Sequence, residues 1–300
     1  MLSTLPLLTF KYNLHLKTSM VVESIINYIH AEKRPEEMLP FGFIIASLAI
    51  LLSLWVFPGY ASFAMVTFTV MAVLPLMVHV VRSEKEKQDK IKEWWKIWIH
   101  RRALVFFLFL FLGFVLAYTF WFLLLPTDVA NNLYFLQINT ITEINTPTGA
   151  VIAAKAAFGD IFTNNLRILA LCILFSFIFG SGAIFILVWN ASVMGVAMAT
   201  TVKIAIAASG SGSAVYFAAF SFALIRFLIH GIPEIMSYFI GGIAGGIISF
   251  AILDIKLGPK RFVQNLSGSL KNASILILVA ALLLVAATTI EVFVTPLFIQ

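Results

Sequence analysis

An arginine, a histidine and a glutamate recur at steps of four in the stretch RFLIHGIPE. On a continuous helix Arg226, His230 and Glu234 would lie on one face, close enough to interact. A proline inside a helix removes one backbone hydrogen bond and clashes with the preceding turn. We therefore predict that one helix ends near His230 and another begins at Pro233, with Glu234 in its first turn. Side chains of these types could handle protons or cations, or they could hold a structural kink.

The rest of the chain has the composition of a membrane protein. Its 300 residues are 61% hydrophobic and 11% charged, whereas soluble domains carry roughly 25% charged residues. Mean hydropathy is +1.01. The predicted fold class is therefore an all-α polytopic transmembrane bundle of seven or eight segments, with a broken helix near His230–Pro233 and additional interfacial helices. The single cysteine, Cys172, excludes an intrachain disulfide and a multi-cysteine metal site.

Charge distribution divides the chain into four parts. We expect a cytoplasmic or interfacial segment over 1–40, a transmembrane hairpin over 41–81, a basic cytoplasmic loop over 82–102 and a membrane domain over 103–300. The net charge of +6 comes from loops beside apolar segments, so we expect anionic lipid rather than nucleic acid as the partner of the basic loop. The N-terminus is expected in the cytoplasm of a multi-pass protein of the cell membrane.

Counting crossings exposes a conflict at the basic stretch 256–271. Crossing segments are expected at 41–57, 60–81, 103–125, 168–189, 191–209, 214–230, 234–255 and 274–293. A polar external loop is expected over 126–149, followed by an interfacial helix over 151–162. Eight crossings would put 256–271 outside, although its excess of positive charge favours the cytoplasm. We therefore predict seven net crossings, with one segment re-entrant or incomplete.

Ionisable groups at membrane depth are costly, so they are expected to face protein and to pair with one another. Lys203 is a further candidate for the polar cluster, and the NNLR stretch offers Asn164, Asn165 and Arg167 as partners. The cluster could form a polar pocket or ion path, or it could be a buried clasp that fixes the kink. Both interpretations remain open from the residues alone.

The stretch GGIAGGIIS follows directly after this motif. Its four glycines form two overlapping pairs at a spacing of four, which allows close approach of a neighbouring helix. The partner helix could belong to the same chain or to a second protomer. The glycines concerned are Gly241, Gly242, Gly245 and Gly246.

Enzymatic interpretations are weak, and we predict no catalytic residues, metal or cofactor. A serine hydrolase would need one of three loop serines, at 209, 211 and 213, to meet His230, and the loop lacks the usual GxSG order. A metalloprotease would need clustered ligands such as HExxH. The other histidines lie singly near predicted membrane edges, at 15, 30, 79 and 100.

Several motifs taken in order resemble the stage II sporulation protein M family of prokaryotic membrane proteins. They are NNLR, FGSG, WNASVMG, HGIPE running into GGIAGG, and IEVFVTP, over roughly residues 103–298. The pattern maps onto Asn164, Asn165, Arg167, Gly180, Gly182, Asn190, Gly195, His230, Gly231, Glu234 and Glu291. The family commonly has Pro-His-Gly where this chain has Ile-His-Gly, and Asn-Gly where it has Asn-Ala. The hairpin over 41–81 lies outside the resemblance.

The resemblance implies a non-enzymatic protein that anchors or organises partners in the cell envelope, with its polar motif residues gathered in one cluster. Glu291 would join that cluster only if the last segment tilts inward. We also expect a homo-oligomer that forms through the glycine face, and envelope protein partners. The alternative is a transporter or channel that uses the broken helix. An intramembrane hydrolase is a second alternative.

Overall fold

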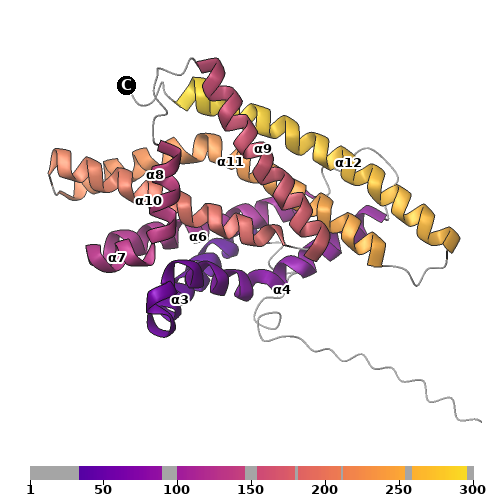
Figure 1. Ribbon diagram of the computed structural model, residues 1–300, viewed down its shortest axis with the longest axis horizontal. Helices are drawn as coiled ribbons and strands as arrows, with labels where there is room; N and C mark the ends of the chain where they lie inside the picture. Colours follow the sequence, from indigo (N-terminus) through magenta and orange to yellow (C-terminus); the bar gives the residue numbers. More distant parts are fainter. Residues whose placement is uncertain are drawn as a thin grey trace, which may run out of the picture.

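The computed structural model describes residues 34–89, 100–145, 154–179, 182–210, 212–253 and 259–295, and no strand occurs within them. Figure 1 shows long helices packed into an elongated bundle. The α-helices are α3 (Met38–Val56), α4 (Ala61–Asp89), α6 (Arg101–Leu124), α7 (Thr127–Leu133), α8 (Phe135–Asn145), α9 (Ala154–Phe179), α10 (Ala183–Ser209), α11 (Ser213–Leu253) and α12 (Pro259–Thr289). Short elements are η1 (Pro35–Glu37), η2 (Pro58–Tyr60) and the π-helix η4 (Ile290–Val294).

Seven helices of the described part of the chain are long and apolar enough to cross a membrane, namely α3, α4, α6, α9, α10, α11 and α12. This confirms the predicted all-α polytopic bundle. The predicted hairpin is formed by α3 and α4, joined by η2 at the expected Pro-Gly turn. Helix α6 coincides with the expected phenylalanine-rich segment.

Two predicted segment boundaries are wrong. One helix was expected to end just before Asn190 and the next to begin just after it. In the structure the first helix, α9, ends at Phe179, and Asn190 lies inside α10. The expected interfacial helix before residue 163 is the first part of α9, so it continues into a crossing segment. Continuous apolar composition gives no signal for a turn, and amphipathic spacing at one end of a helix does not mark where that helix stops. Residues 151–153 lie outside the described residues.

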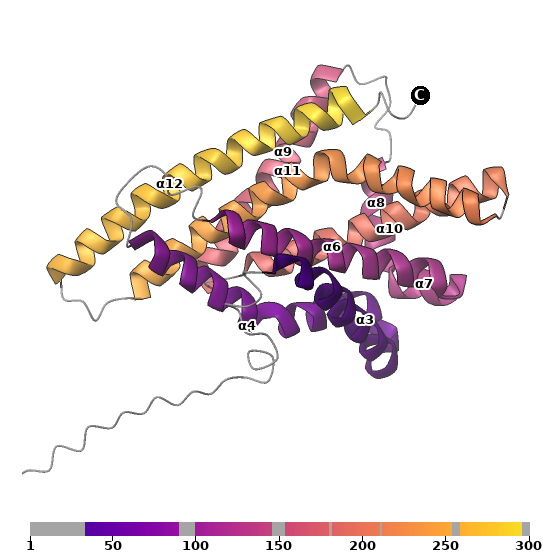
Figure 2. The ribbon, with the colours of Figure 1, turned by 180° about the vertical axis from the view of Figure 1, so that it is seen from behind.

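The predicted break between His230 and Pro233 is also wrong, because α11 runs without interruption through Pro233. At 1.5 Å per residue its 41 residues extend about 60 Å, roughly twice the hydrocarbon thickness of a bilayer. Figures 1 and 2 both show α11 changing direction near the middle of its length. A proline bends a helix at the point where it removes a backbone hydrogen bond. Pro233 therefore marks a bend within α11 and not the end of a helix.

The expected external loop over 126–149 is partly helical, since α7 and α8 lie within it. The expected basic loop over 256–271 is also shorter than predicted, because α12 begins at Pro259. Residues 254–258 lie outside the described residues. Charged residues do not prevent a helix when they lie at its aqueous end.

The ends of the helices gather on two sides of the bundle. In both views the end of α4, the start of α6, the end of α11 and the start of α12 lie toward one side, whereas α7 and the tip of α10–α11 lie toward the other (Figures 1 and 2). A single α11 crossing thus brings the start of α12 to the same side as the end of α4 and the start of α6. Seven crossings therefore agree with the charge distribution.

This arrangement predicts opposite labelling of two engineered cysteines. Asp128 in α7 and Ser267 in α12 are both exposed, and the native Cys172 is buried. In intact cells a membrane-impermeant maleimide is expected to label Asp128→Cys and not Ser267→Cys. Both are expected to react after permeabilisation. Labelling of both variants in intact cells would restore the eight-crossing alternative.

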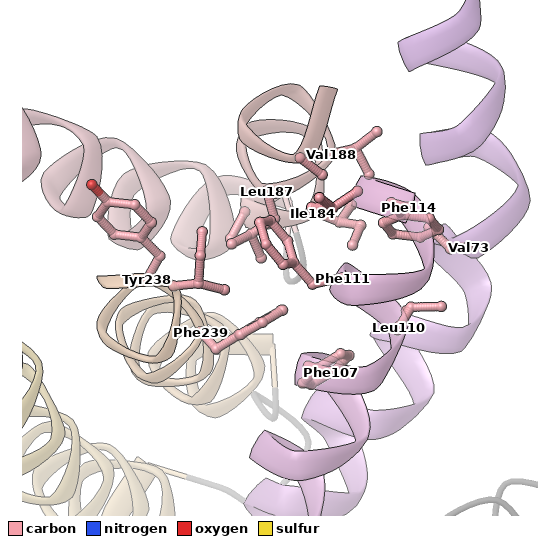
Figure 3. Packing of buried hydrophobic residues seen from close by; sticks show 14 of the residues in the cluster. Val73, Phe107, Leu110, Phe111, Phe114, Ile184, Leu187, Val188, Tyr238 and Phe239 are labelled. Atoms are coloured by element: carbon pink, nitrogen blue, oxygen red, sulfur yellow. The ribbon is translucent and has the colours of Figure 1, made fainter. Parts of the chain in front are cut away.

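Aromatic side chains fill the centre of the bundle. Phe107 of α6 stacks on Phe239 of α11 with ring centroids 4.9 Å apart, and Figure 3 shows Leu187 and Phe111 beside this pair. The same buried cluster includes residues of α3 and α4, such as Ile50 and Met65. The hairpin outside the family resemblance therefore packs into the same core as the rest of the chain.

Candidate functional site

Three polar side chains at helical spacing lie near the middle of α11. The Tyr238 hydroxyl donates a hydrogen bond of 2.9 Å to Oε1 of Glu234, one turn earlier. His230 lies one further turn toward the start of the helix and is half-buried. Because α11 is continuous, His230 and Glu234 have the alignment that the sequence analysis gave only for an unbroken helix, and Tyr238 extends it. Tyr238 is fully buried, so its ring belongs to the core although its hydroxyl is polar.

The end of the chain supplies the other half of this site. Thr295 donates a hydrogen bond to the carbonyl of Ile290 and lies 3.3 Å from Nδ1 of His230. Because the hydroxyl proton is used within η4, the contact suits an imidazole that carries its proton on Nδ1. Glu291 of η4 interacts electrostatically with Glu234. We call His230, Glu234, Tyr238, Glu291 and Thr295 the α11–η4 cluster.

Glu291 follows directly after α12, as the second residue of η4. Helix α12 packs antiparallel to α11, with Ser237 donating to the carbonyl of Ala280. The buried residues Leu284 and Ala287 place Glu291 on the same side as this contact. Helix packing thus brings Glu291 inward, as the sequence analysis required.

The α11–η4 cluster lies at the depth of the middle of α6. Phe239, just after the cluster, stacks on Phe107 near the start of α6. Gly231, next to His230, faces Met194 of α10, and the neighbouring Gly195 packs against Tyr118 near the end of α6. The polar groups between these two levels are therefore far from either end of the bundle. Intramembrane polar groups at such depth need protein partners, which His230 and Glu234 have here.

Three of the predicted cluster residues make contacts elsewhere. The ammonium group of Lys203 lies 4.2 Å from the ring centroid of Phe122, a cation–π contact between α10 and α6. Asn190 donates to the carbonyl of Ile186 in its own helix. Arg226 lies over the adjacent ring of Phe227, one turn before His230. Each of these three side chains therefore contacts a group outside the α11–η4 cluster.

The NNLR stretch divides between the inside and the outside of the bundle. Asn165 is buried with 6% exposure, one turn before Leu169, which packs against α11. Asn164 and Arg167 are exposed on the opposite face of α9. A helix turns by about 100° per residue, so adjacent residues cannot share a face. Only Asn165 faces the interior as predicted.

The predicted glycine face packs within the chain. A side chain at Gly245 would meet the carbonyl of Ile173, and one at Gly242 would lie 2.9 Å from Cβ of Ala183. Gly241 faces Leu169, and Gly246 is also buried. Helix α9 therefore occupies this surface, together with the start of α10. The expected homo-oligomer cannot form through these glycines.

A buried amide that the sequence analysis missed connects three helices. Gln137 of α8 accepts a hydrogen bond from Ser62 of α4 at 2.8 Å and donates one to Ser192 of α10 at 3.2 Å. Gln137 and Ser192 are fully buried. The polar stretch after α6 offered no sign of this, because only the fold brings the three segments together. This network holds the short helix α8 onto the bundle.

The structure separates one of the candidate serines from His230. Ser213 and His230 lie on the same helix, about 25 Å apart along its axis, so they cannot form a catalytic pair. Ser211 lies outside the described residues. Among the described residues, no three histidine, cysteine or acidic side chains are placed to hold a metal ion.

The α11–η4 cluster can act chemically in two ways. Its hydrogen bonds can fix the end of the chain against the bend of α11. Its two carboxyl groups and imidazole could also take up and release protons, because they lie close together in a low-dielectric region.

Comparison with known proteins supplies a family match. The sequence model described as stage II sporulation protein M matches residues 103–296 of this chain. No curated protein and no solved structure gives a match. The matched region contains the entire α11–η4 cluster and the NNLR stretch, and it begins after the α3–α4 hairpin.

Proposed function

Because the chain belongs to the stage II sporulation protein M family, we propose that it is a non-catalytic integral membrane protein that serves as a scaffold or assembly partner in the cell envelope. The observation that carries this proposal is that the polar motif residues at depth are bound to groups of the same chain. His230 contacts Thr295, and Glu234 accepts from Tyr238. Such contacts favour one fixed arrangement of helices.

The contact of His230 with Thr295 would act as a clasp that holds η4 against α11. Within hydrocarbon an unpaired hydrogen-bonding group costs several kcal/mol, so separation of η4 from α11 would be strongly disfavoured. The clasp also holds the bend of α11, which directs the first part of this helix along α10. A rigid bundle with fixed surfaces suits a protein that positions other proteins.

The proposal extends to orientation and lipids. We place the N-terminus in the cytoplasm and the basic segment 82–102 beside anionic headgroups, following the charge rule. The tryptophans of that segment lie outside the described residues. A homo-oligomer remains a prediction and would have to use a surface other than the glycines of α11.

A transporter or channel is the second candidate, and one observation favours it. Glu234 and Glu291 come from different elements and interact with each other. Within the described residues neither carboxylate forms an ion pair with lysine or arginine. Neighbouring acids without a cationic partner are suited to holding a shared proton or a bound cation.

Reconstitution separates the two candidates. We expect proteoliposomes that contain the purified full chain to show no proton or monovalent-cation flux above that of empty vesicles, measured with an internal pH dye and a potassium gradient. The Glu234→Gln variant is expected to be equally silent. A flux in the wild type that Glu234→Gln abolishes would contradict the scaffold proposal and establish transport.

Native assembly supplies the positive test. In mild detergent the scaffold proposal predicts a stable complex much larger than the 33.2 kDa chain, recovered with the same partner from independent native membrane preparations. A chain that always migrates alone would contradict it.

A further inference from the structure

Helix α9 carries a regular stripe of side chains on the face directed away from the bundle. Its members follow one another at alternating steps of four and three, the spacing at which residues form one continuous edge of a helix. All of them are exposed, and the polar ones lie toward the start of the helix. The stripe consists of Asp160, Asn164, Arg167, Leu171, Leu174 and Ile178; we call it the α9 stripe.

Arg167 lies near the middle of the candidate membrane span of α9. The candidate membrane span of α9 runs from Phe158 to Phe179. At 1.5 Å per residue Arg167 is about 14 Å from the first and about 18 Å from the second along the axis. The packing of Leu169 against Gly241 and of α9 along α11 places this region beside the centre of the bundle. An exposed arginine at this depth would face lipid.

No acid of the described part of this chain neutralises Arg167. It forms no ion pair there. Glu234 and Glu291 belong to the α11–η4 cluster, on the side of α9 that packs against α11. Asp160 shares the stripe but lies two helical turns away, about 10 Å along the axis. A guanidinium group in lipid without a counter-charge is among the costliest arrangements in a membrane protein.

A second copy of the chain is poorly suited to cover this stripe. Two copies inserted with the same topology would present parallel α9 helices, related by a twofold axis. If the two α9 stripes packed against each other, Arg167 of one copy would face Arg167 of the other in a low-dielectric region. Like charges in that position repel strongly, and the distant Asp160 could not compensate for both.

We infer that the α9 stripe is a docking surface for a membrane helix of another protein, and that this helix carries a carboxylate at the depth of Arg167. Charge complementarity carries the inference, since a carboxylate meets the guanidinium in bidentate geometry. The exposed Asn164 can add interhelical hydrogen bonds, and Leu171, Leu174 and Ile178 provide apolar packing below them. The inference deepens the proposed scaffold function and rests on it for the biological role of the contact.

Designed transmembrane peptides test the surface directly. Each probe is an apolar peptide of roughly 20 residues with either glutamate, glutamine or leucine at its centre. The full chain is reconstituted in vesicles with a fluorophore on Gly159→Cys, an exposed position of α9 near the stripe where an added side chain meets no atom. Energy transfer to a labelled peptide then reports association.

We expect the glutamate peptide to associate at least tenfold more tightly than the leucine peptide. The Arg167→Leu variant is expected to lose this preference, whereas Arg102→Leu retains it, because Arg102 is an exposed arginine in the first turn of α6. A lysine-centred peptide is expected to associate more tightly with the Arg167→Glu variant than with the wild type. This result would show that the substitution changes the charge pairing and not the fold.

Equal association of all peptides, or a glutamate preference that survives Arg167→Leu, would overturn the inference. Self-crosslinking of a Leu174→Cys variant across two copies of the chain would also overturn it, because the stripe would then pair with itself. These outcomes leave the scaffold proposal standing if no flux is found and a fixed partner is still recovered. A Glu234-dependent flux would remove the scaffold proposal and leave the peptide result unaffected.

Discussion

The His100→Ala variant is expected to unfold with about 3 kcal/mol less stability than the wild type, the upper end of the cost of removing one partner from a buried hydrogen bond. His100 precedes α6 and lies within hydrogen-bonding distance of Glu84 in α4. Their side chains are only 2% and 0% exposed, respectively. Removing the imidazole leaves the carboxylate of Glu84 without this partner in a region that water does not reach.

The free energy of unfolding can be measured by titration with a denaturing detergent in mixed micelles. Arg34→Ala is the control, because it breaks the exposed pair Arg34–Glu37, whose side chains are 62% and 44% exposed, and such pairs contribute about 0–1 kcal/mol. A second variant, Glu84→Gln combined with His100→Ala, is expected to recover part of the loss. Equal stability of His100→Ala and the wild type would show that the pair does not hold α4 to α6.

The Gly245→Ala variant is expected to lose about 1–3 kcal/mol of stability, the usual cost of overpacking. A methyl group at Gly245 would meet the carbonyl oxygen of Ile173 and would lie 3.1 Å from the amide nitrogen of Phe177. Both are backbone atoms of α9, so neither can move aside as a side chain could. Helices α9 and α11 would have to separate along their length.

Gly268→Ala is the matched control, since Gly268 lies in α12 with no atom near an added Cβ. Alanine has the higher helix propensity by about 1 kcal/mol, so Gly268→Ala is expected to be neutral or slightly stabilising. Thermal unfolding followed by fluorescence-detected gel filtration compares the two variants. Equal midpoints would mean that the close approach of α9 and α11 does not depend on glycine.

Expectations from the sequence were most accurate where composition changed sharply. The α3–α4 hairpin and α6 are bounded by charged residues, a proline or a Pro-Gly turn, and their predicted bounds agree with the structure to within a few residues apart from the longer C-terminal end of α4. In the second half of the chain apolar residues continue across the true turn near Gly182. Hydropathy cannot separate consecutive crossing helices there, and the prediction chose Asn190 instead.

The bend of α11 illustrates a different limit. Pro233 and Gly231 signalled a local weakness correctly, yet the helix continues through them. The prediction of a break rested only on the backbone hydrogen bond that Pro233 removes. Packing along both halves of α11, by α10, α9 and α12, holds the helix together on either side of the bend.

Residue type alone indicated that His230 and Glu234 would face protein at depth, whereas Glu291 was expected there only if the last segment tilted inward. Their actual partners, Tyr238 and Thr295, could not be predicted, because a tyrosine or threonine in an apolar segment is common. The pair of His100 with Glu84 was missed for the same reason, since each residue alone resembled an ordinary group at a membrane edge.

The amino-acid sequence by itself determined that this chain is a helical membrane protein of the stage II sporulation protein M family. Composition and length suffice for the helical membrane class, because apolar runs of about 20 residues are what spanning helices need; the family follows from the match of the sequence model over residues 103–296. Only the tertiary structure decided that Asn165 turns inward while Asn164 and Arg167 turn outward. The rotation of α9 about its axis is set by Leu169 and Ile173, which pack against Gly241 and Gly245 of a helix distant in the chain.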